Sequence, residues 1–311
     1  MNDNATATIA ASQSLTVSGA VTGAAGKSLT VSNSGTGTLV VATTGSIGVP
    51  LVANGNVSFT AQTSGSAKLV QTVPSLSIGA TGYVALADAT GGTPANSNRT
   101  VLVTGSTASS SSTFSVAAGG TLDLGSNDAI VHGDSSGQFA TLLGLVGQNG
   151  ATSGIISSWV NADTTGREAI AAVQLTSTDV GGSGFLSTGL FDGQSVVAGD
   201  VLLKTTYYGD TNLDGKVDGT DYSRIDAGFL ASATGWQNGG FVPGVVNGTD
   251  YALIDASYGA NLTALPASLV ASPASEVAAP ASSSAVPEPT SLGLLAMGAS
   301  ALLSRRIRRR K

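Results

Sequence analysis

The 311-residue chain has no cysteine and a single histidine, His132. A disulfide framework is therefore excluded, and no zinc site of the usual cysteine and histidine type can form around one imidazole. The lack of disulfides neither favours nor excludes export. Aromatic residues are also scarce, at 5%, and only Phe59, Tyr83 and Phe114 precede residue 139. This change in composition indicates a domain boundary near residue 134.

Basic residues are too few and too clustered for a nucleic-acid surface. The chain has 13 basic and 19 acidic residues, and six of the basic ones fall in its last seven positions. Removal of everything after Val286, including Glu288, leaves 13 − 6 = 7 basic and 19 − 1 = 18 acidic residues, a net charge of 7 − 18 = −11. Nucleic acids and anionic membranes are bound through clustered Lys and Arg. We therefore expect no nucleic-acid partner.

Candidate catalytic groups are also sparse. Glycoside hydrolysis needs two carboxyl groups roughly 5–10 Å apart, and the first 120 residues contain only Asp3 and Asp88. The next polar cluster consists of Asp123, Asp128, His132 and Asp134. No nucleophile-elbow motif accompanies it, so we interpret His132 as a turn or strand-end residue. The sequence predicts no catalytic residues.

Residues 1–133 are rich in short segments that alternate apolar and polar side chains between Gly, Ser, Asn and Thr turns, a pattern typical of β-strands. The predicted strands are 14–18, 28–32, 38–42, 56–60, 75–78, 100–104, 113–117 and 121–124. Their recurrence at about 10–25 residues predicts a β-solenoid with a slim aliphatic core. A right-handed parallel β-helix is favoured, with similarity to the passenger regions of autotransporter-like adhesins, and a β-sandwich is the alternative.

Residues 134–206 have a mixed composition and are interpreted as an α/β connecting region. We expect helices over 138–146 and 166–174 and a strand over 201–208. Trp159 and Trp236 could stack on sugar rings, but isolated tryptophans are more often core residues, and we interpret them so.

A calcium-binding loop is predicted at residues 210–221. Oxygen-bearing ligands fall at loop positions 1, 3, 5, 7, 9 and 12, where position 7 contributes its backbone carbonyl. These ligands are Asp210, Asn212, Asp214, Lys216, Asp218 and Asp221. Gly215 occupies position 6, where the backbone must turn sharply. Ca²⁺ takes six to eight oxygen ligands, and this spacing wraps them around one point.

A second copy of the pattern follows, in which Asp250 takes the place of Asp221, a period of 250 − 221 = 29. Residues 219–229 and 248–258 are similar and each predicts a short helix with an apolar stripe. In the second loop, however, Gly239, Phe241 and Pro243 occupy positions 1, 3 and 5. Because three oxygen ligands are missing, we expect residues 239–250 to bind calcium weakly or not at all.

Two such loops, each followed by one helix, resemble a type I dockerin module over residues 207–260. The resemblance implies that calcium holds the duplicated helices together and that one helix face docks onto a cohesin-like protein. Loop positions 10 and 11 matter for docking in that family, and here they are Gly219-Thr220 and Gly248-Thr249.

The C-terminus carries a second recognisable pattern. The motif Val286-Pro-Glu-Pro289 precedes an apolar run over 290–304 and a basic tail over 305–311. This order resembles the PEP-CTERM sorting signal and implies export, a transient inner-membrane anchor and processing by an exosortase. The apolar run of about 15 residues is shorter than the ~20 needed to span a bilayer comfortably. Residues 261–285, rich in Ala, Ser and Pro, are interpreted as a linker, and 286–311 as the sorting signal with a hydrophobic helix.

The first eight residues show neither the basic nor the apolar region of a signal peptide, so we expect that a leader has been lost from the chain as given. Together these patterns predict a mainly β, non-enzymatic structural or adhesive protein of the cell envelope or extracellular space. One alternative is a dockerin adaptor that binds a cohesin-like partner in polysaccharide degradation. Another is a carbohydrate-active β-helix enzyme with an extracellular polysaccharide as substrate.

Overall fold

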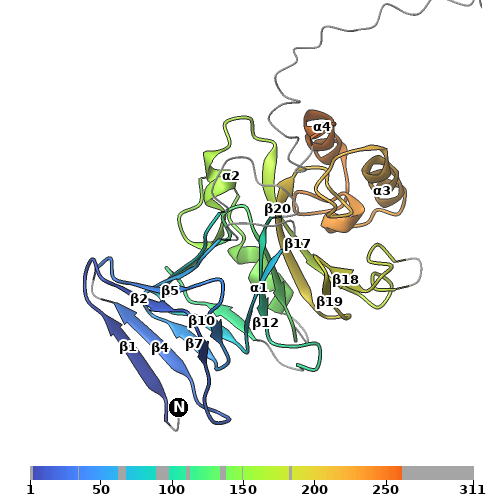
Figure 1. The fold of residues 1–311 in the computed structure, drawn as a ribbon. Helices are drawn as coiled ribbons and strands as arrows, with labels where there is room; N and C mark the ends of the chain where they lie inside the picture. Colours follow the sequence, from blue (N-terminus) through green and yellow to red (C-terminus); the bar gives the residue numbers. More distant parts are fainter. Residues whose placement is uncertain are drawn as a thin grey trace, which may run out of the picture. The chain divides into compact units, whose positions relative to one another are not determined.

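The computed structural model describes residues 3–33, 35–61, 68–88, 98–109, 113–133, 138–148, 150–181 and 184–260. The predicted linker, sorting signal and hydrophobic helix lie outside these residues. Met1–Ala264 form one compact unit. Within it the fold is mainly β with several parallel sheets, as predicted (Figure 1).

Three sheets contain most of the strands of the described chain. The first contains β1 (Ala5–Ile9), β4 (Leu29–Asn33), β7 (Leu51–Ala53), β10 (Leu76–Ile78) and β13 (Phe114–Val116). The second contains β2 (Ser14–Val17), β5 (Thr38–Val41), β8 (Asn56–Phe59), β11 (Tyr83–Leu86), β14 (Thr121–Asp123) and β16 (Gly154–Ile156). The third contains β9 (Leu69–Val73), β12 (Thr100–Thr104), β15 (Asp128–Val131), β20 (Val201–Tyr207) and β17 (Glu168–Gln174). Short strands β3 (Ala20–Val21) and β6 (Ser46–Ile47) pair separately.

Successive strands within the first sheet are parallel and lie one repeat apart in sequence. Leu29 pairs with Ala5, Leu51 with Leu29, and Leu76 with Leu51. The differences in residue number are 29 − 5 = 24, 51 − 29 = 22 and 76 − 51 = 25. The next step, from Leu76 to Phe114, is longer, at 114 − 76 = 38. Each of the first five repeats adds one strand to the first sheet and one to the second, and the third to fifth repeats also add one to the third sheet. All eight predicted strands are present, and seven additional strands lie among them.

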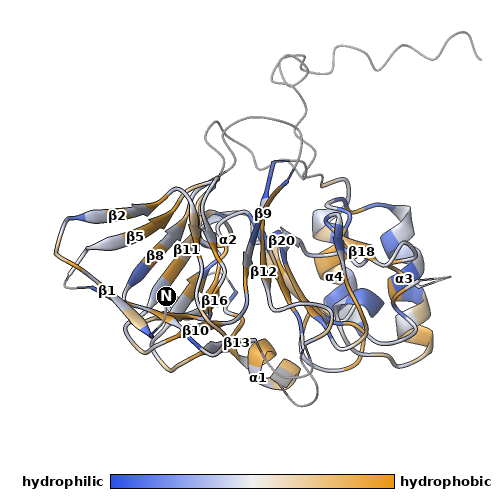
Figure 2. Cartoon of the chain, turned by 60° about the horizontal axis from the view of Figure 1, so that its bottom comes forward, coloured by the Kyte–Doolittle hydropathy of each residue, from blue (hydrophilic) through white to orange (hydrophobic). Residues whose placement is uncertain are grey.

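The core between the sheets consists of aliphatic side chains that stack in register. Leu39, Val57, Val84, Leu122 and Ile155 follow one another across the second sheet and are all buried. Period-2 alternation places these residues inward and the intervening Thr, Ser and Asn outward. Figure 2 shows hydrophobic residues along β10, β11 and β16, and both hydrophobic and hydrophilic segments on the helices α3 and α4.

The third sheet closes with two antiparallel strands and is buried on both faces. β20 pairs with β15 and also with β17. Residues 169–173 are all buried, with Ala169 and Ala171 in one apolar cluster and Ile170 and Ala172 in the other. The prediction of a helix over 166–174 was therefore wrong. Its Ala-rich sequence favours a helix locally, but pairing in a doubly covered sheet overrides that propensity.

The other elements of the connecting region agree with their predictions or extend them. The helix expected over 138–146 is α1 (Gln138–Leu145), and the strand expected over 201–208 is β20. Two further elements were not predicted: α2 (Ser158–Ala162), which is capped by the Ser157 side chain, and the hairpin of β18 (Leu190–Phe191) and β19 (Gln194–Ser195). The strands of both predicted regions, 1–133 and 134–206, share the third sheet.

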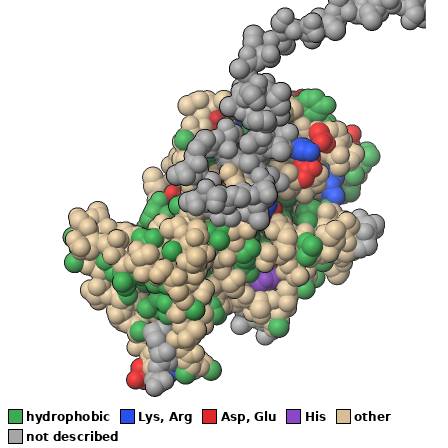
Figure 3. All heavy atoms as spheres, viewed as in Figure 1, with side chains coloured by type: hydrophobic (Ala, Val, Ile, Leu, Met, Phe, Trp, Pro, Cys, Tyr) green, Lys and Arg blue, Asp and Glu red, His purple; other side chains and the backbone are tan. Residues whose placement is uncertain are grey.

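The repeats after β20 form α3 (Gly219–Leu230), the 3₁₀ helix η1 (Trp236–Asn238) and α4 (Gly248–Ser257), and both α-helices were predicted. Charged side chains gather over this helical part in Figure 3, whereas the visible β-rich surface is mostly uncharged. No helix among the described residues is long and apolar enough to cross a membrane.

Candidate metal centre

The predicted calcium loop follows β20 directly and begins at a buried residue. Asp210 has no exposed surface, and the Thr206 hydroxyl on β20 donates a hydrogen bond to its carboxylate. The Trp236 indole N–H donates to the Asp210 carbonyl at 2.7 Å. Trp236 is thus a core residue, as expected, and it joins the second repeat to the start of the first loop.

The first half of the loop folds around the carboxylate of Asp210. Its oxygens accept backbone hydrogen bonds from Asp214 and Gly215, both at 3.0 Å. Leu213 and Gly215 have positive φ values of 60° and 85°, which turn the chain back sharply. The Asn212 side-chain oxygen accepts from the Asp214 N–H at 2.9 Å, so the oxygens of positions 1 and 3 both face the same peptide group.

The second half of the loop caps α3. Asp218 is the N-cap and accepts from the Thr220 N–H at 2.8 Å, while Asp221 accepts from the Asp218 N–H at 2.9 Å. This is a reciprocal capping box. The other oxygen of Asp221 reaches back to the N–H groups of Thr211 at 2.9 Å and Asn212 at 3.3 Å. Asp221 therefore ties the end of the loop to its beginning.

Burial disfavours the charged form of the loop carboxylates. Burial raises the pKa of Asp210 to about 7, against a lowering by the Lys204 ammonium, and the charges of Asp221 and Asp214 raise it further. Burial likewise raises the pKa of Asp221. Lys216, at position 7, is exposed, as expected for a residue that would contribute only its carbonyl. A cation between the carboxylates would relieve this repulsion.

The described residues contain no group of three or more His, Cys, Asp or Glu side chains placed to hold a metal ion. The predicted donor set is broader, because it also includes the Asn212 amide oxygen and the Lys216 carbonyl. Hard oxygen donors of these types are the ones that Ca²⁺ prefers. The residues present therefore fit the ion chemically, and calcium binding stays a prediction.

The second loop keeps the backbone framework of the first. Asp250 is fully buried, and it accepts from the N–H groups of Phe241 at 2.7 Å, Val242 at 3.2 Å and Asn247 at 2.9 Å. These bonds match those that Asp221 makes in the first repeat. Asn247 caps α4 as Asp218 caps α3. The loop thus retains its closing carboxylate although positions 1, 3 and 5 have lost their oxygens.

Hydrophobic contacts replace the missing ligands. Phe241, at position 3, is 8% exposed, and its ring packs 5.0 Å from that of Trp236 and 6.4 Å from that of Tyr208. Gly239, at position 1, adopts φ of 88° against Ile225, where a Cβ would clash at 2.6 Å. The substitutions therefore form an alternative core for the loop.

The two repeats contact each other reciprocally. The Tyr222 hydroxyl donates to Asp255, and the equivalent Tyr251 hydroxyl donates to Asp226 at 2.6 Å. The ring of Tyr222 also lies 5.5 Å from that of Tyr258, and Phe229 lies 5.9 Å from Tyr251. Each pair maps onto the other by the shift from one repeat to the next. The sequence indicated these tyrosines only as part of an apolar stripe, whereas their hydroxyl groups join the two helices.

The polar residues considered for catalysis lie in separate hydrogen-bond networks. Asp123 accepts from the Tyr83 hydroxyl at 2.7 Å, and His132 Nδ1 lies 2.8 Å from Asp200. Asp128 pairs with Arg99 at 2.6 Å, and Asp134 lies outside the described residues. Trp159 packs edge-on against Tyr207 at 5.9 Å. The structure does not bring these residues together into one site.

A buried cluster of charges on the third sheet was not predicted from the sequence. Arg99, Asp128 and Lys204 are fully buried there. A single lysine inside the apolar strand 201–208 was the one available signal, but the strand register decides what that lysine faces. Lys204 is the direct cross-strand partner of Asp128.

Residues 285–310 match the family model described as the PEP-CTERM protein-sorting motif. No curated protein and no solved structure matches the chain. The match agrees with the interpretation of residues 286–311 and indicates recognition by an exosortase-type processing enzyme. The C-terminus of the chain therefore carries a PEP-CTERM sorting motif, which indicates a protein that is exported to the cell envelope and sorted at its C-terminus.

Proposed function

We propose that this protein is a non-enzymatic structural or adhesive component of the cell envelope or extracellular space. In this proposal a parallel β-solenoid forms its body and a calcium-stabilised, dockerin-like module follows. The observation that carries the proposal is the contrast between an ordered parallel β stack, mostly uncharged where its surface is visible, and a separate acidic loop.

The solenoid interpretation is supported by the way strands repeat. Each of the first turns adds a parallel strand to the first sheet at a nearly constant spacing in sequence, and neighbouring turns contact one another through stacked aliphatic side chains. A right-handed coil, as in autotransporter-like passenger regions, is the form we infer. Such a stack presents a long regular surface, which suits an extended structural or adhesive role.

The non-enzymatic interpretation is supported by the apolar character of the pocket between α1 and the second loop. Its lining includes Phe139, Leu143, Trp236 and Phe241. The polar side chain of Gln148, also in the lining, bonds to the backbone of Ile170. Binding sites for reactive substrates combine apolar walls with polar groups that converge on the ligand. The pocket fits a packing gap between segments better than a catalytic cleft.

The calcium interpretation is supported by the buried carboxylates of Asp210 and Asp221 and by the loop turns at Leu213 and Gly215. Asp210, Asn212, Asp214, Asp218 and Asp221 would hold the ion through side chains and Lys216 through its carbonyl. The ion would supply positive charge to a site where burial and repulsion disfavour carboxylates. Its binding would stabilise the folded module by mass action.

Calcium titration calorimetry and thermal melts of the full chain, with and without chelator, test this proposal. We expect one site and a melting temperature that rises with calcium. Asp214→Ala should abolish both effects, because Asp214 is exposed and its loss leaves the core intact. Asp3→Ala, which removes a remote exposed carboxylate, is the matched control. Absence of calcium binding by the unmodified protein would refute the metal role and leave the structural role to the β stack.

A docking role is the second candidate, and one observation favours it. Gly219-Thr220 and Gly248-Thr249 are exposed in both repeats, and the repeats are related by reciprocal contacts. A cohesin-like partner could therefore meet equivalent surfaces on either helix. Calcium-dependent retention of the full chain on immobilised cohesin would support this candidate, and loss of retention in the double variant Thr220→Asp, Thr249→Asp would assign the surface. A chain that passes through the column unretained with calcium present has no such role.

A further inference from the structure

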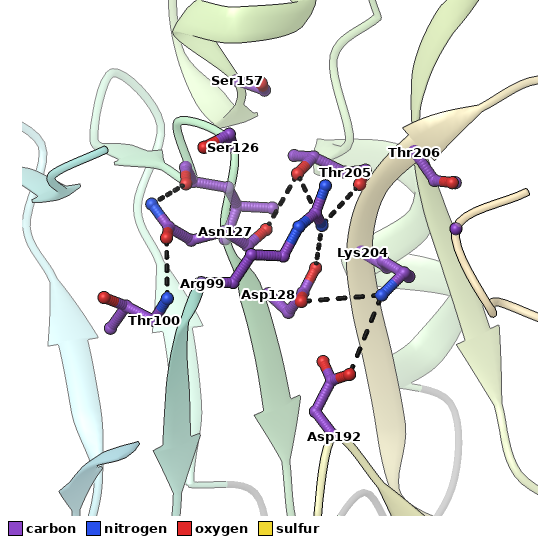
Figure 4. Close-up of polar contacts among 12 residues, drawn as sticks. Arg99, Thr100, Ser126, Asn127, Asp128, Ser157, Asp192, Lys204, Thr205 and Thr206 are labelled. Carbon is purple, nitrogen blue, oxygen red and sulfur yellow. Dashed lines mark hydrogen bonds and ion pairs between the residues drawn. The ribbon is translucent and has the colours of Figure 1, made fainter. Parts of the chain in front are cut away.

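Five charged side chains meet on the outer face of the third sheet. They are Lys68, Arg99, Asp128, Asp192 and Lys204 (Figure 4 shows the last four). Lys68 directly precedes β9, Arg99 directly precedes β12, and Asp128 and Lys204 lie opposite each other on β15 and β20. Asp192 lies in the turn between β18 and β19 and adopts a positive φ of 53°.

The cluster is buried and has unequal numbers of cations and carboxylates. The side chains of Arg99, Asp128 and Lys204 are 0% exposed, those of Asp192 and Lys68 only 7% and 15%. Three basic groups thus face two carboxylates. Arg99 Nη1 donates hydrogen bonds to one carboxylate oxygen of Asp128 and to the Thr205 carbonyl, both at 2.6 Å. Charges in such a setting bear a large desolvation penalty, which conversion to neutral groups would remove.

Lys68 and Asp192 are in direct contact inside this cluster. The Lys68 amine donates a hydrogen bond to Asp192 Oδ1. The Lys204 ammonium lies 3.8 Å from the same oxygen, and Asp128 Oδ2 lies 4.0 Å from Lys68 Nζ. Burial, opposed by Asp128 and reinforced by Lys204 and Arg99, lowers the pKa of Lys68 to about 7. Burial therefore favours the uncharged, nucleophilic form of this amine.

We propose that Lys68 and Asp192 condense to an intramolecular isopeptide bond, with Asp128 as the neighbouring carboxylate that moves the proton. The lone pair of the neutral Lys68 amine attacks Cγ of the protonated Asp192 carboxyl group, and the C–N bond forms. Asp128 accepts the proton released from nitrogen and returns it to the departing hydroxyl oxygen. The C–O bond then breaks and one water molecule leaves, with no change in oxidation state.

The other two cations have a role in this reaction. Lys204 lies close to Asp192 Oδ1, where negative charge develops as nitrogen attacks, and its protonated form stabilises that charge. Burial lowers the pKa of Lys204, and the Asp128 carboxylate opposes this effect. Arg99 holds Asp128 through Nη1 and keeps it a carboxylate, because Arg99 and Lys204 together oppose the effect of burial and lower the pKa of Asp128. Asp128 is thereby kept as a proton acceptor beside the amine.

The bond would join the start of β9 to the β18–β19 turn, across 192 − 68 = 124 residues. The bond would hold the β18–β19 turn in place over the outer face of the third sheet. A chain without cysteine has no disulfide for this purpose, and an amide is also indifferent to the redox state of the compartment. Such a link suits an exported protein but does not depend on the function proposed above.

Intact-mass spectrometry of the full chain under denaturing conditions tests the proposal. The unmodified protein should be lighter than its sequence by the mass of one water molecule, read against Asp192→Ala from the same preparation, which keeps other processing constant. A tryptic digest should give one branched peptide joining the segments around residues 68 and 192, with cleavage after Lys68 blocked. Asp192→Asn should lose ammonia instead of water, because its amide nitrogen becomes the leaving group.

Further variants separate a chemical role from a structural one. Lys68→Arg should restore the full mass, and Asp128→Asn should leave most of the protein unlinked while its circular dichroism spectrum stays native. A full sequence mass in the unmodified protein, with normal cleavage after Lys68, would show that the pair is only ionic and overturn the proposal. A branched peptide through Lys204 would overturn the assignment of Lys68 as the nucleophile.

Discussion

The two loops at 210–221 and 239–250 have the same backbone framework and different interiors. Each ends in a buried aspartate, Asp221 or Asp250, that accepts three or more hydrogen bonds and closes the loop. The first loop fills its interior with carboxylates and an amide, the second with Phe241 and glycines. The framework therefore needs only the closing aspartate and the N-cap. The extra acids of the first loop need another explanation, and a bound cation supplies one.

The sharpest contrast is expected at loop position 3. Phe241→Ala removes a ring packed on Trp236 and should destabilise the protein by about 3–4 kcal/mol. Asn212→Ala at the equivalent position should cost less than about 1 kcal/mol in chelator, because it removes polar contacts near the surface. Urea denaturation of both variants measures the difference. Equal losses would mean that the two interiors do not differ as described.

The second loop, which has lost the oxygen ligands of positions 1, 3 and 5, tests the shared framework through its closing aspartate. Asp250→Ala leaves one buried and two partly buried N–H groups without their acceptor and should cost about 3 kcal/mol, with or without calcium. Asp3→Ala, which removes a remote exposed acid, is the control. Chemical denaturation in chelator gives the values. A stable Asp250→Ala protein would show that the second loop does not rely on this frame.

Calcium should act on the first loop alone. At a free concentration of 100 times the Kd, one site adds about 2.7 kcal/mol to the free energy of unfolding, and Asp210→Asn or Asp214→Ala should remove that gain. Asp250→Ala should retain it, although it starts from a less stable protein. Melts across a calcium series check this pattern. A gain that disappears equally in Asp250→Ala would mean that both loops bind.

A smaller effect of pH on the stability of the protein is expected from a residue outside both loops. Burial, reinforced by Asp163, raises the pKa of Glu168 to about 7. Its folded pKa lies above its unfolded value, so its contribution is complete below about pH 4.5 and is lost as pH rises toward 7. Glu168→Gln should therefore flatten this decline by less than about 1 kcal/mol, since the side chain is only half-buried. Melts of both proteins between pH 4 and pH 8 in chelator measure the effect, and parallel curves would contradict it.

The helical module was predictable because its signals are local. Gly215, the spacing of the acids and the capping residues Asp218 and Asn247 all act within one or two turns of chain. The strands of residues 1–133 were predictable for the same reason, since period-2 alternation is read residue by residue. The elements predicted wrongly or missed depend on distant partners. The sequence of β17 favours a helix locally, and its pairing with β20 makes it a strand.

The charged cluster shows more clearly which features sequence patterns do not predict. Lys68, Asp128 and Asp192 are ordinary residues in the sequence, and only the register of β9, β12, β15 and β20 together with the β18–β19 turn brings them into contact. The sequence period that identified the second loop gives no information about such neighbours. Long-range register is the quantity that sequence patterns alone did not supply.

The doubly covered third sheet has a consequence for exchange with solvent. Strands β12, β15 and β20 have neighbours on both sides and apolar layers on both faces. Their amide protons can meet deuterium only when this sheet opens, an event that also uncovers the aliphatic stack on one face and the packing beneath the helical repeats on the other. These three strands should therefore be the last part of the described chain to take up deuterium, and their exchange rate should report the stability of both halves at once.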